Sequence, residues 1–137
     1  MRTEYPAKIL LAWGEAISGN AALRDWLVKN GYPELGLFTY ALRNKQDARK
    51  WLLDHGHAHL MAVISGIAGD TGALDWLERH GMHVLKQLAL TGDGDEDAMK
   101  WLVKNGHREL AMIGHKMHRV KRQMDDDFTD PHKYAQE

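Results

Sequence analysis

Four tryptophans recur at a fixed interval of 25 residues, and this spacing constrains the fold more than any other feature of the sequence. Trp26, Trp51, Trp76 and Trp101 are each followed at once by a leucine and, five residues later, by a glycine. Another leucine stands nine residues after each tryptophan. Residue columns that keep their register over several such intervals indicate an array of repeated structural units. The chain is therefore expected to fold as a repeat protein.

Each repeat is predicted to contain two short helices. The first covers about 34–43, 59–68 and 83–90 in three successive units, where apolar residues recur at spacings of three and four. The second runs through the Trp-Leu pair and ends at a polar residue followed by glycine. Glycine is expected there because it enters the left-handed conformation without a Cβ penalty.

The links before the second helices carry residues that can cap a helix. Asn20, Asp70 and Asp95 stand where a side-chain oxygen would accept from free N–H groups of the first turn. The segment 91–97 superficially resembles a calcium loop. Counted from Asp93, however, the sixth and twelfth positions of an EF-hand hold Ala98 and Lys104 instead of glycine and glutamate. We therefore interpret this segment as an inter-helix link.

Stacking is the expected route to a core, because a pair of ten-residue helices cannot bury its apolar face alone. The sequence predicts an all-α, right-handed α-solenoid of helical hairpins over residues 1–124. Its repeats cover about 7–21, 22–46, 47–71, 72–96 and 97–124, and residues 125–137 form an acidic polar tail. The tryptophans are expected to form a ladder along the stack. Charges that alternate in sign between repeats, such as Asp25 and Lys50, are expected to lie side by side.

The segments 69–81 and 94–106 resemble the second helix of an ankyrin repeat and its glycine stop, and 59–68 resembles the first. The similarity covers roughly residues 7–119. Ankyrin repeats bind protein partners, so the resemblance implies the same broad role here. Two features depart from the family: the period is 25 rather than about 33, and the Thr-Pro-Leu-His opening is absent. Short turns are expected in place of the ankyrin β-hairpin.

Composition excludes several classes of protein. At 137 residues the chain has the length of one domain, and it has no cysteine for a disulfide, a thiol nucleophile or a thiolate metal site. Its 18 Lys and Arg nearly balance its 19 Asp and Glu, so it lacks the broad basic field of most nucleic-acid binders. No targeting segment or membrane-length apolar run is recognisable. We expect a cytoplasmic monomer that binds neither nucleic acid nor membrane.

No motif for catalysis is present. The two serines, Ser18 and Ser65, do not stand in a nucleophile elbow, and no carboxylate pair has the apolar setting that separates an acid from a base. The expectation is a non-catalytic protein without a cofactor.

Nine histidines nevertheless leave a metal site open as the alternative function. Five of them fall in two successive turns that stacking would bring to one edge, and three neutral imidazoles can bind zinc with an open position for hydrolysis. These candidate ligands are His55, His57, His59, His80 and His83. Two of the five, His55 and His80, alternate with asparagine before the glycine stop, which is the pattern of a helix end rather than of a ligand set.

The positions that vary between repeats are the better guide to a partner-binding surface. The positions that hold the same residue in every repeat are fixed by packing and say nothing about a ligand. Aromatic and apolar side chains in the variable columns are plausible anchors for a protein partner. The candidates are Trp13, Tyr32, Tyr40, His57 and Met61. Trp13 has a second interpretation, in which it packs against the adjacent repeat.

Overall fold

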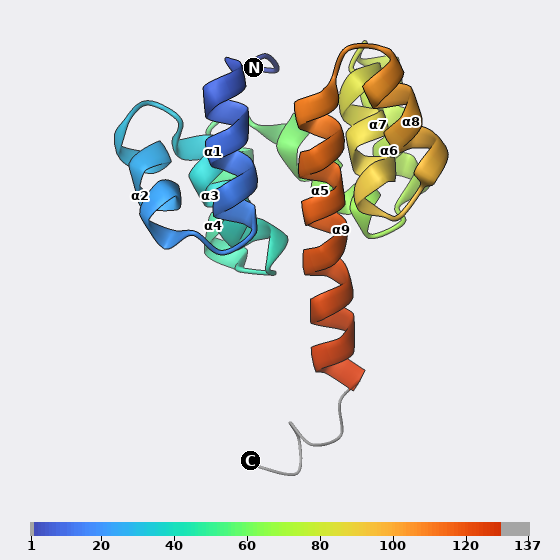
Figure 1. Cartoon of the computed structure of the whole chain (residues 1–137). Helices are drawn as coiled ribbons and strands as arrows, with labels where there is room; N and C mark the ends of the chain where they lie inside the picture. Colours follow the sequence, from blue (N-terminus) through green and yellow to red (C-terminus); the bar gives the residue numbers. More distant parts are fainter. Residues whose placement is uncertain (1, 130–137) are drawn as a thin grey trace.

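The computed structural model describes residues 2–129, which form α-helices and no strand (Figure 1). In chain order the helices are α1 (Ala7–Ile17), α2 (Ala21–Lys29), α3 (Pro33–Leu42), α4 (Gln46–Asp54), α5 (Ala58–Ile67), α6 (Thr71–Arg79), α7 (His83–Gly92), α8 (Glu96–Lys104) and α9 (Arg108–Thr129). The all-α prediction is confirmed. The four nine-residue helices α2, α4, α6 and α8 begin 25 residues apart, so the spacing of the tryptophans is also the spacing of the helices.

The predicted helix ends are confirmed at both termini of the short helices. Gly31 and Gly56 follow α2 and α4 with φ of +92° and +82°, in the left-handed region that a residue with Cβ rarely enters. At the other end, the side chains of Asn20, Asp70 and Asp95 accept from first-turn N–H groups of α2, α6 and α8. Local sequence therefore accounts for the starts of α2, α6 and α8 and for the glycine stops, whereas α4 begins after Lys45 without a side-chain cap.

The helices form two layers. We call α1, α3, α5, α7 and α9 the inner helices and α2, α4, α6 and α8 the outer helices. Each inner helix contacts the next inner helix, and each outer helix packs on the two inner helices that flank it in sequence. No two outer helices share a comparable contact within residues 2–129. The inner helices thus form the core layer, and the outer helices cover the grooves between them.

The first and last inner helices also contact each other, so the inner layer closes into a ring. Gly14 of α1 lies close to Ile113 and Lys116 of α9, and Lys116 Nζ donates to Glu15 Oε1 at 2.8 Å. Gly114, one hundred residues after Gly14, lies in the same way against Thr91 of α7. The last inner helix therefore takes the place that a helix preceding α1 would occupy. The α9–α1 groove has no outer helix over it within the described residues.

The core of the ring is apolar and aromatic. Trp13 and Phe38 meet edge to face with ring centroids 5.1 Å apart, and both are almost fully buried. The leucine that follows each repeat tryptophan is also fully buried: Leu27, Leu52, Leu77 and Leu102. These leucines anchor the outer helices on the inner layer.

Helix α9 is longer than the sequence predicted. The expected polar tail began at residue 125, whereas the structure continues the helix to Thr129. The reason lies at Arg119, because the corresponding positions of earlier repeats hold Gly19, Asn44, Gly69 and Gly94, all at positive φ. Without a residue that favours the left-handed conformation, the helix runs on. Residues 130–137 of the expected tail lie outside the described residues.

Two expectations about neighbouring repeats are wrong. Lys50 pairs with Asp54 on its own helix instead of with Asp25. The Oδ1 atom of Asp25 lies 3.5 Å from Nε of Arg24, its neighbour in sequence. The tryptophans form no ladder, since their aromatic partners within residues 2–129 are histidines. Both differences have one cause: the outer helices pack inward on the inner layer, not on one another.

None of the described helices has the length and apolar character to cross a bilayer.

Candidate functional site

A shallow groove on the outside of the ring contains one of the predicted anchors, Tyr40. The groove has a volume of about 350 Å³ and is lined by Leu37 and Tyr40 of α3 together with Lys45, Asp47, Ala48 and Trp51 at α4. We call it the Tyr40 groove. The guanidinium of Arg24 lies 4.5 Å from the centre of the Tyr40 ring, a cation–π distance that holds the ring in place. The groove therefore presents two preordered aromatic walls with charged residues beside them.

The other predicted anchors divide between this region and the interior. The ring of His57 stacks on Trp51, 5.6 Å between centroids, so His57 adjoins one wall of the Tyr40 groove. Met61 is partly buried against the core. Trp13 is 2% exposed, so it packs inside the array, as its second interpretation predicted. It offers no exposed anchor.

Tyr32 belongs to a separate cluster that ties down the N-terminal segment, residues 2–5. The Arg2 guanidinium lies over the Tyr32 ring at 4.8 Å, donates to the Gly31 carbonyl and lies 3.4 Å from the carboxylate of Glu34. The Tyr5 hydroxyl donates to the same carboxylate at 3.0 Å. Burial, together with the negative charge of Glu34, raises the pKa of the Tyr5 hydroxyl. Glu34 is therefore a satisfied buried acid that pins residues 2–5 against α3.

Two of the five candidate metal ligands serve as helix caps. His55 Nδ1 lies 2.8 Å from the Trp51 carbonyl, and His80 Nδ1 lies 2.8 Å from the Trp76 carbonyl. Asn30 makes the corresponding bond in its own repeat. Because a carbonyl only accepts, Nδ1 of each histidine carries the proton. The imidazoles also stack on the tryptophans whose carbonyls they cap, at 4.1 and 4.2 Å.

Of the remaining three candidate ligands, His57 and His59 are neighbours, with ring centroids 6.0 Å apart, and His83 is paired with an acid. His59 is fully buried with Nε2 2.8 Å from the Arg2 carbonyl, and burial lowers the pKa of its imidazole. Burial also lowers the pKa of His57. His83 Nδ1 contacts Glu78 at 2.7 Å, and the hydrogen bond from His83 lowers the pKa of that carboxyl. Within residues 2–129, no group of three or more histidine and acidic side chains is arranged to hold a metal ion.

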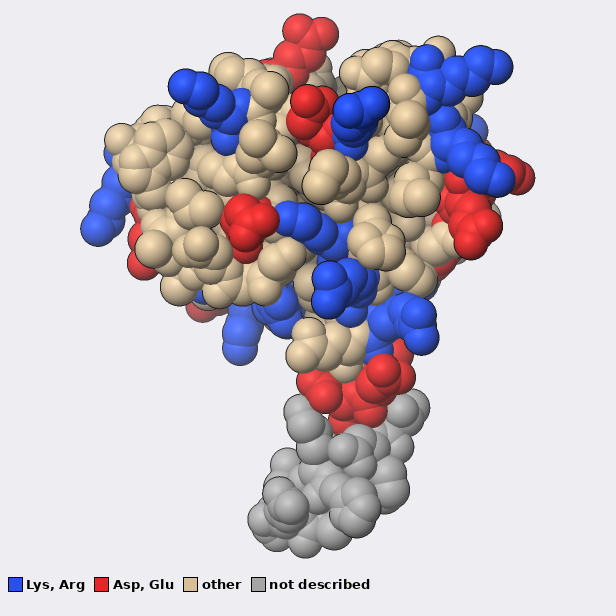
Figure 2. All heavy atoms as spheres, viewed as in Figure 1, with Lys and Arg blue, Asp and Glu red and all other residues tan. Residues whose placement is uncertain are grey.

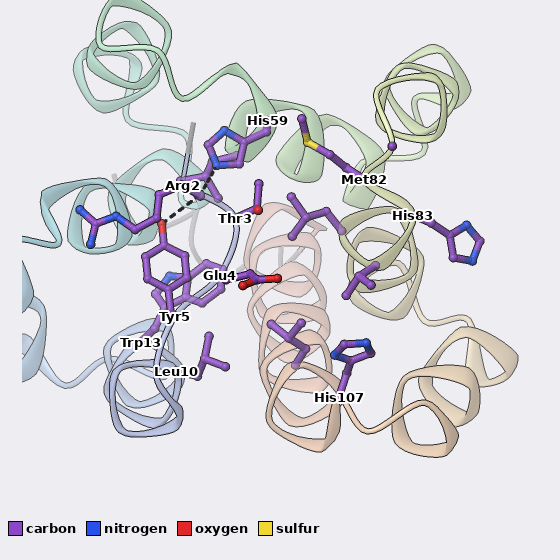
Figure 3. A pocket seen from close by; sticks show the side chains of 15 residues that line it. Arg2, Thr3, Glu4, Tyr5, Leu10, Trp13, His59, Met82, His83 and His107 are labelled. Atoms are coloured by element: carbon purple, nitrogen blue, oxygen red, sulfur yellow. Dashed lines mark hydrogen bonds between the residues drawn. The ribbon is translucent and has the colours of Figure 1, made fainter.

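A second and larger cavity, of about 470 Å³, lies at the mouth of the ring where the inner helices begin. We call it the central cavity. Leucines from four inner helices form its walls: Leu10, Leu60, Leu85 and Leu110. Figure 3 shows Thr3 and Glu4 pointing into it from the N-terminal segment, with His107 and Met82 at its rim. The ring closure described above brings these residues together from both ends of the chain.

Charges of both signs are interspersed over the face shown in Figure 2, which is the face that carries α1 and α9. Acidic side chains gather at the lower end of α9. The distribution of charge on this face thus does not indicate a binding site, and the two cavities are the better candidates.

Sequence reasoning missed Trp51 and Glu4 as parts of these cavities. Trp51 belongs to a column that is the same in every repeat, and only the packing of α4 on α3 shows that it lines a groove together with Tyr40. Glu4 precedes the first repeat, where no periodic pattern exists to place it. One signal was available in the sequence: Glu4 is an acidic residue a few positions before the apolar columns that begin at Ile9. A charged side chain is almost never fully buried, so Glu4 has to face solvent or a cavity.

Comparison with protein-family models, curated protein sequences and solved structures finds no match to this chain.

Proposed function

We propose that this chain is a non-catalytic protein-interaction module, built as a solenoid of ankyrin-like helical hairpins that lack the β-hairpin. The alternation of inner and outer helices at a 25-residue period supports the solenoid description. So does the contact of each inner helix with the next.

The observation that carries the proposal is the Tyr40 groove. Aromatic side chains dominate the energetics of protein interfaces because they bury large areas with few rotatable bonds. Here Tyr40 and Trp51 flank an apolar floor formed by Leu37 and Ala48, and Lys45 and Asp47 supply polar partners at the edge. This combination of an apolar centre with a polar rim is typical of a protein-binding site.

Closure of the ring decides which surface the partner uses. In an open solenoid, the inner helices line a continuous face that binds extended partners. Here α1 and α9 meet, so the inner helices face a shared core. The partner therefore docks on the outer surface, where α3 and α4 leave the groove open.

The test is quantitative co-purification from the native lysate with tagged wild type, Tyr40→Ala and Leu53→Ala. Leu53 is 55% exposed on the same helix as Trp51 but does not line the groove, which makes it the matched control. We expect a stoichiometric partner with wild type and with Leu53→Ala, and its loss with Tyr40→Ala at unchanged circular dichroism. Equal recovery with all three proteins would overturn the proposal.

A parallel purification in chelator separates this function from a histidine metal site. The interaction module retains its partner in chelator. Loss of the partner in chelator, with near-equimolar zinc on the untreated protein, would instead support metal chemistry at the histidines.

A further inference from the structure

Glu4 has an unusual position at the central cavity. It is the one acidic residue among the described residues that line the cavity, and Figure 3 shows its carboxylate pointing into the space between α1, α7 and α9. No hydrogen bond or ion pair within residues 2–129 involves that carboxylate. Among residues 2–129, therefore, no side chain pairs with the negative charge that Glu4 places at a cavity walled in part by leucines.

The nearby cationic groups are engaged elsewhere. The Arg2 guanidinium is held by the Gly31 carbonyl, Glu34 and the Tyr32 ring, and it points away from the cavity in Figure 3. His83 also points away from the cavity, toward Glu78. Within the described part of the chain, neither Arg2 nor His83 thus pairs with Glu4.

The walls favour a hydrocarbon group. Leucines from α1, α5, α7 and α9 surround a volume of about 470 Å³, within the range of roughly 300–1,000 Å³ that small-molecule sites occupy. Burial of aliphatic surface against such walls provides the non-directional part of binding. A carboxylate at the mouth then selects the polar end of the ligand.

The N-termini of the inner helices favour a ligand of the opposite charge, an anion. Inner helices α1, α5 and α7 begin at this mouth without a side-chain cap, and their partial positive charge by itself favours an anion. The formal charge of Glu4 has the opposite effect.

We propose that the central cavity binds a small organic ammonium ion with an aliphatic body, whose ammonium group pairs with Glu4 and whose hydrocarbon part packs on the leucine walls. This site is distinct from the Tyr40 groove, because the two cavities share no lining residue. It does not depend on the proposed protein partner.

The experiment is a titration of the full chain, labelled with ¹⁵N, with three probes of equal chain length: hexylammonium, hexanol and hexanoate. Amide shifts are followed at neutral pH and low ionic strength. Wild type is compared with Glu4→Gln and with Asp75→Asn, an exposed acid on α6 that does not line the cavity. Glu4 is itself exposed, so its substitution leaves the fold intact.

We expect all saturable shifts to map to the leucine walls, with hexylammonium binding more tightly than hexanol and hexanoate most weakly. Glu4→Gln should weaken hexylammonium about threefold, the size of an exposed ion pair, and leave hexanol unchanged. Asp75→Asn should change neither. Tightest binding by hexanoate would show that the helix N-termini dominate, and absence of saturable shifts with any probe would show that the cavity is no ligand site. Either result overturns the proposal.

Discussion

Lys116 and Glu15 are 101 residues apart in sequence, yet the Lys116 ammonium donates to the Glu15 carboxylate at 2.8 Å. The hydrogen bond and the charge of Lys116 lower the pKa of the Glu15 carboxyl. The pair lies across the groove between the first and last inner helices, where the array closes. Closure removes the free ends of the inner layer, and for this reason the proposed partner is placed on the outside of the ring.

The helix caps give the first prediction. Asp95→Ala removes the acceptor for the Ala98 N–H at the start of α8 and should lower the free energy of unfolding by about 0.5–2 kcal/mol. Lys45 occupies the same position before α4 without a side-chain bond, so Lys45→Ala is the matched control. Urea denaturation measures both. Equal effects of the two substitutions would contradict the assigned role of Asp95.

The close packing of α9 on α7 gives the second. A Cβ at Gly114 would lie 2.6 Å from Thr91 Cγ2 and 2.8 Å from Thr91 Cβ. Gly114→Ala should therefore push the helices apart and cost about 1–3 kcal/mol of stability. Met112→Ala, at an exposed position of the same helix, should change stability by less than about 0.5 kcal/mol. Thermal denaturation distinguishes them, and an unaffected melting temperature for Gly114→Ala would refute this packing.

The link after each inner helix gives the third. Gly69 has φ of +93° and Asn44, at the same position of the preceding repeat, has φ of +73°. Gly69→Ala should cost roughly 1–2 kcal/mol, because a Cβ is unfavourable in the left-handed region. Asn44→Gly should keep or slightly raise stability. The two unfolding curves, measured side by side, should shift in these different directions; a stabilising Gly69→Ala would be inconsistent with the structure.

Buried His59 gives the fourth, a dependence of stability on pH. Burial lowers the pKa of its imidazole below the ordinary value of 6.5 in the folded protein. The unfolded chain therefore takes up a proton that the folded chain does not, so this contribution to stability is present above pH 6.5 and is lost as the pH falls below it. His57 acts in the same direction. His59→Gln should flatten the slope of unfolding free energy between pH 7.5 and 5.

The comparison at pH 8 serves as the internal control for this variant. There the imidazole is neutral in both states, so any difference from wild type reports lost packing and the lost bond to the Arg2 carbonyl. An unchanged slope in His59→Gln would exclude His59 as the source of the pH dependence.

Local features were predictable from the sequence, and long-range ones were not. Glycine stops, the caps at Asn20 and Asp95, and the alternation of helices all follow from residue chemistry within a few positions. Contact between α1 and α9 depends on the angle at which each inner helix packs on the next, and no residue pattern encodes that angle directly. The Lys116–Glu15 pair is interpretable only once the closure is known.

The candidate sites divide in the same way. Tyr40 could be proposed from the sequence because it is an aromatic residue in a column whose other members, Glu15, Ser65, Leu90 and His115, have no shared character. Trp13 was predicted as an anchor with a packing alternative, and only the contact with Phe38 decides between them. The expected charge and tryptophan ladders failed because the sequence does not reveal that outer helices pack inward rather than on one another.

The most direct test of the account is the distance between α1 and α9 in solution, since both the proposed docking on the outer surface and the central cavity depend on the ring. Leu11 and Met112 are 54% and 51% exposed on these two helices, and the chain has no native cysteine to interfere with labelling. Spin labels on Leu11→Cys and Met112→Cys, measured by double electron–electron resonance, should give one distance below about 20 Å. An open stack, with four spacings of 8–10 Å between five inner helices, would instead give roughly 30–40 Å and would contradict the ring.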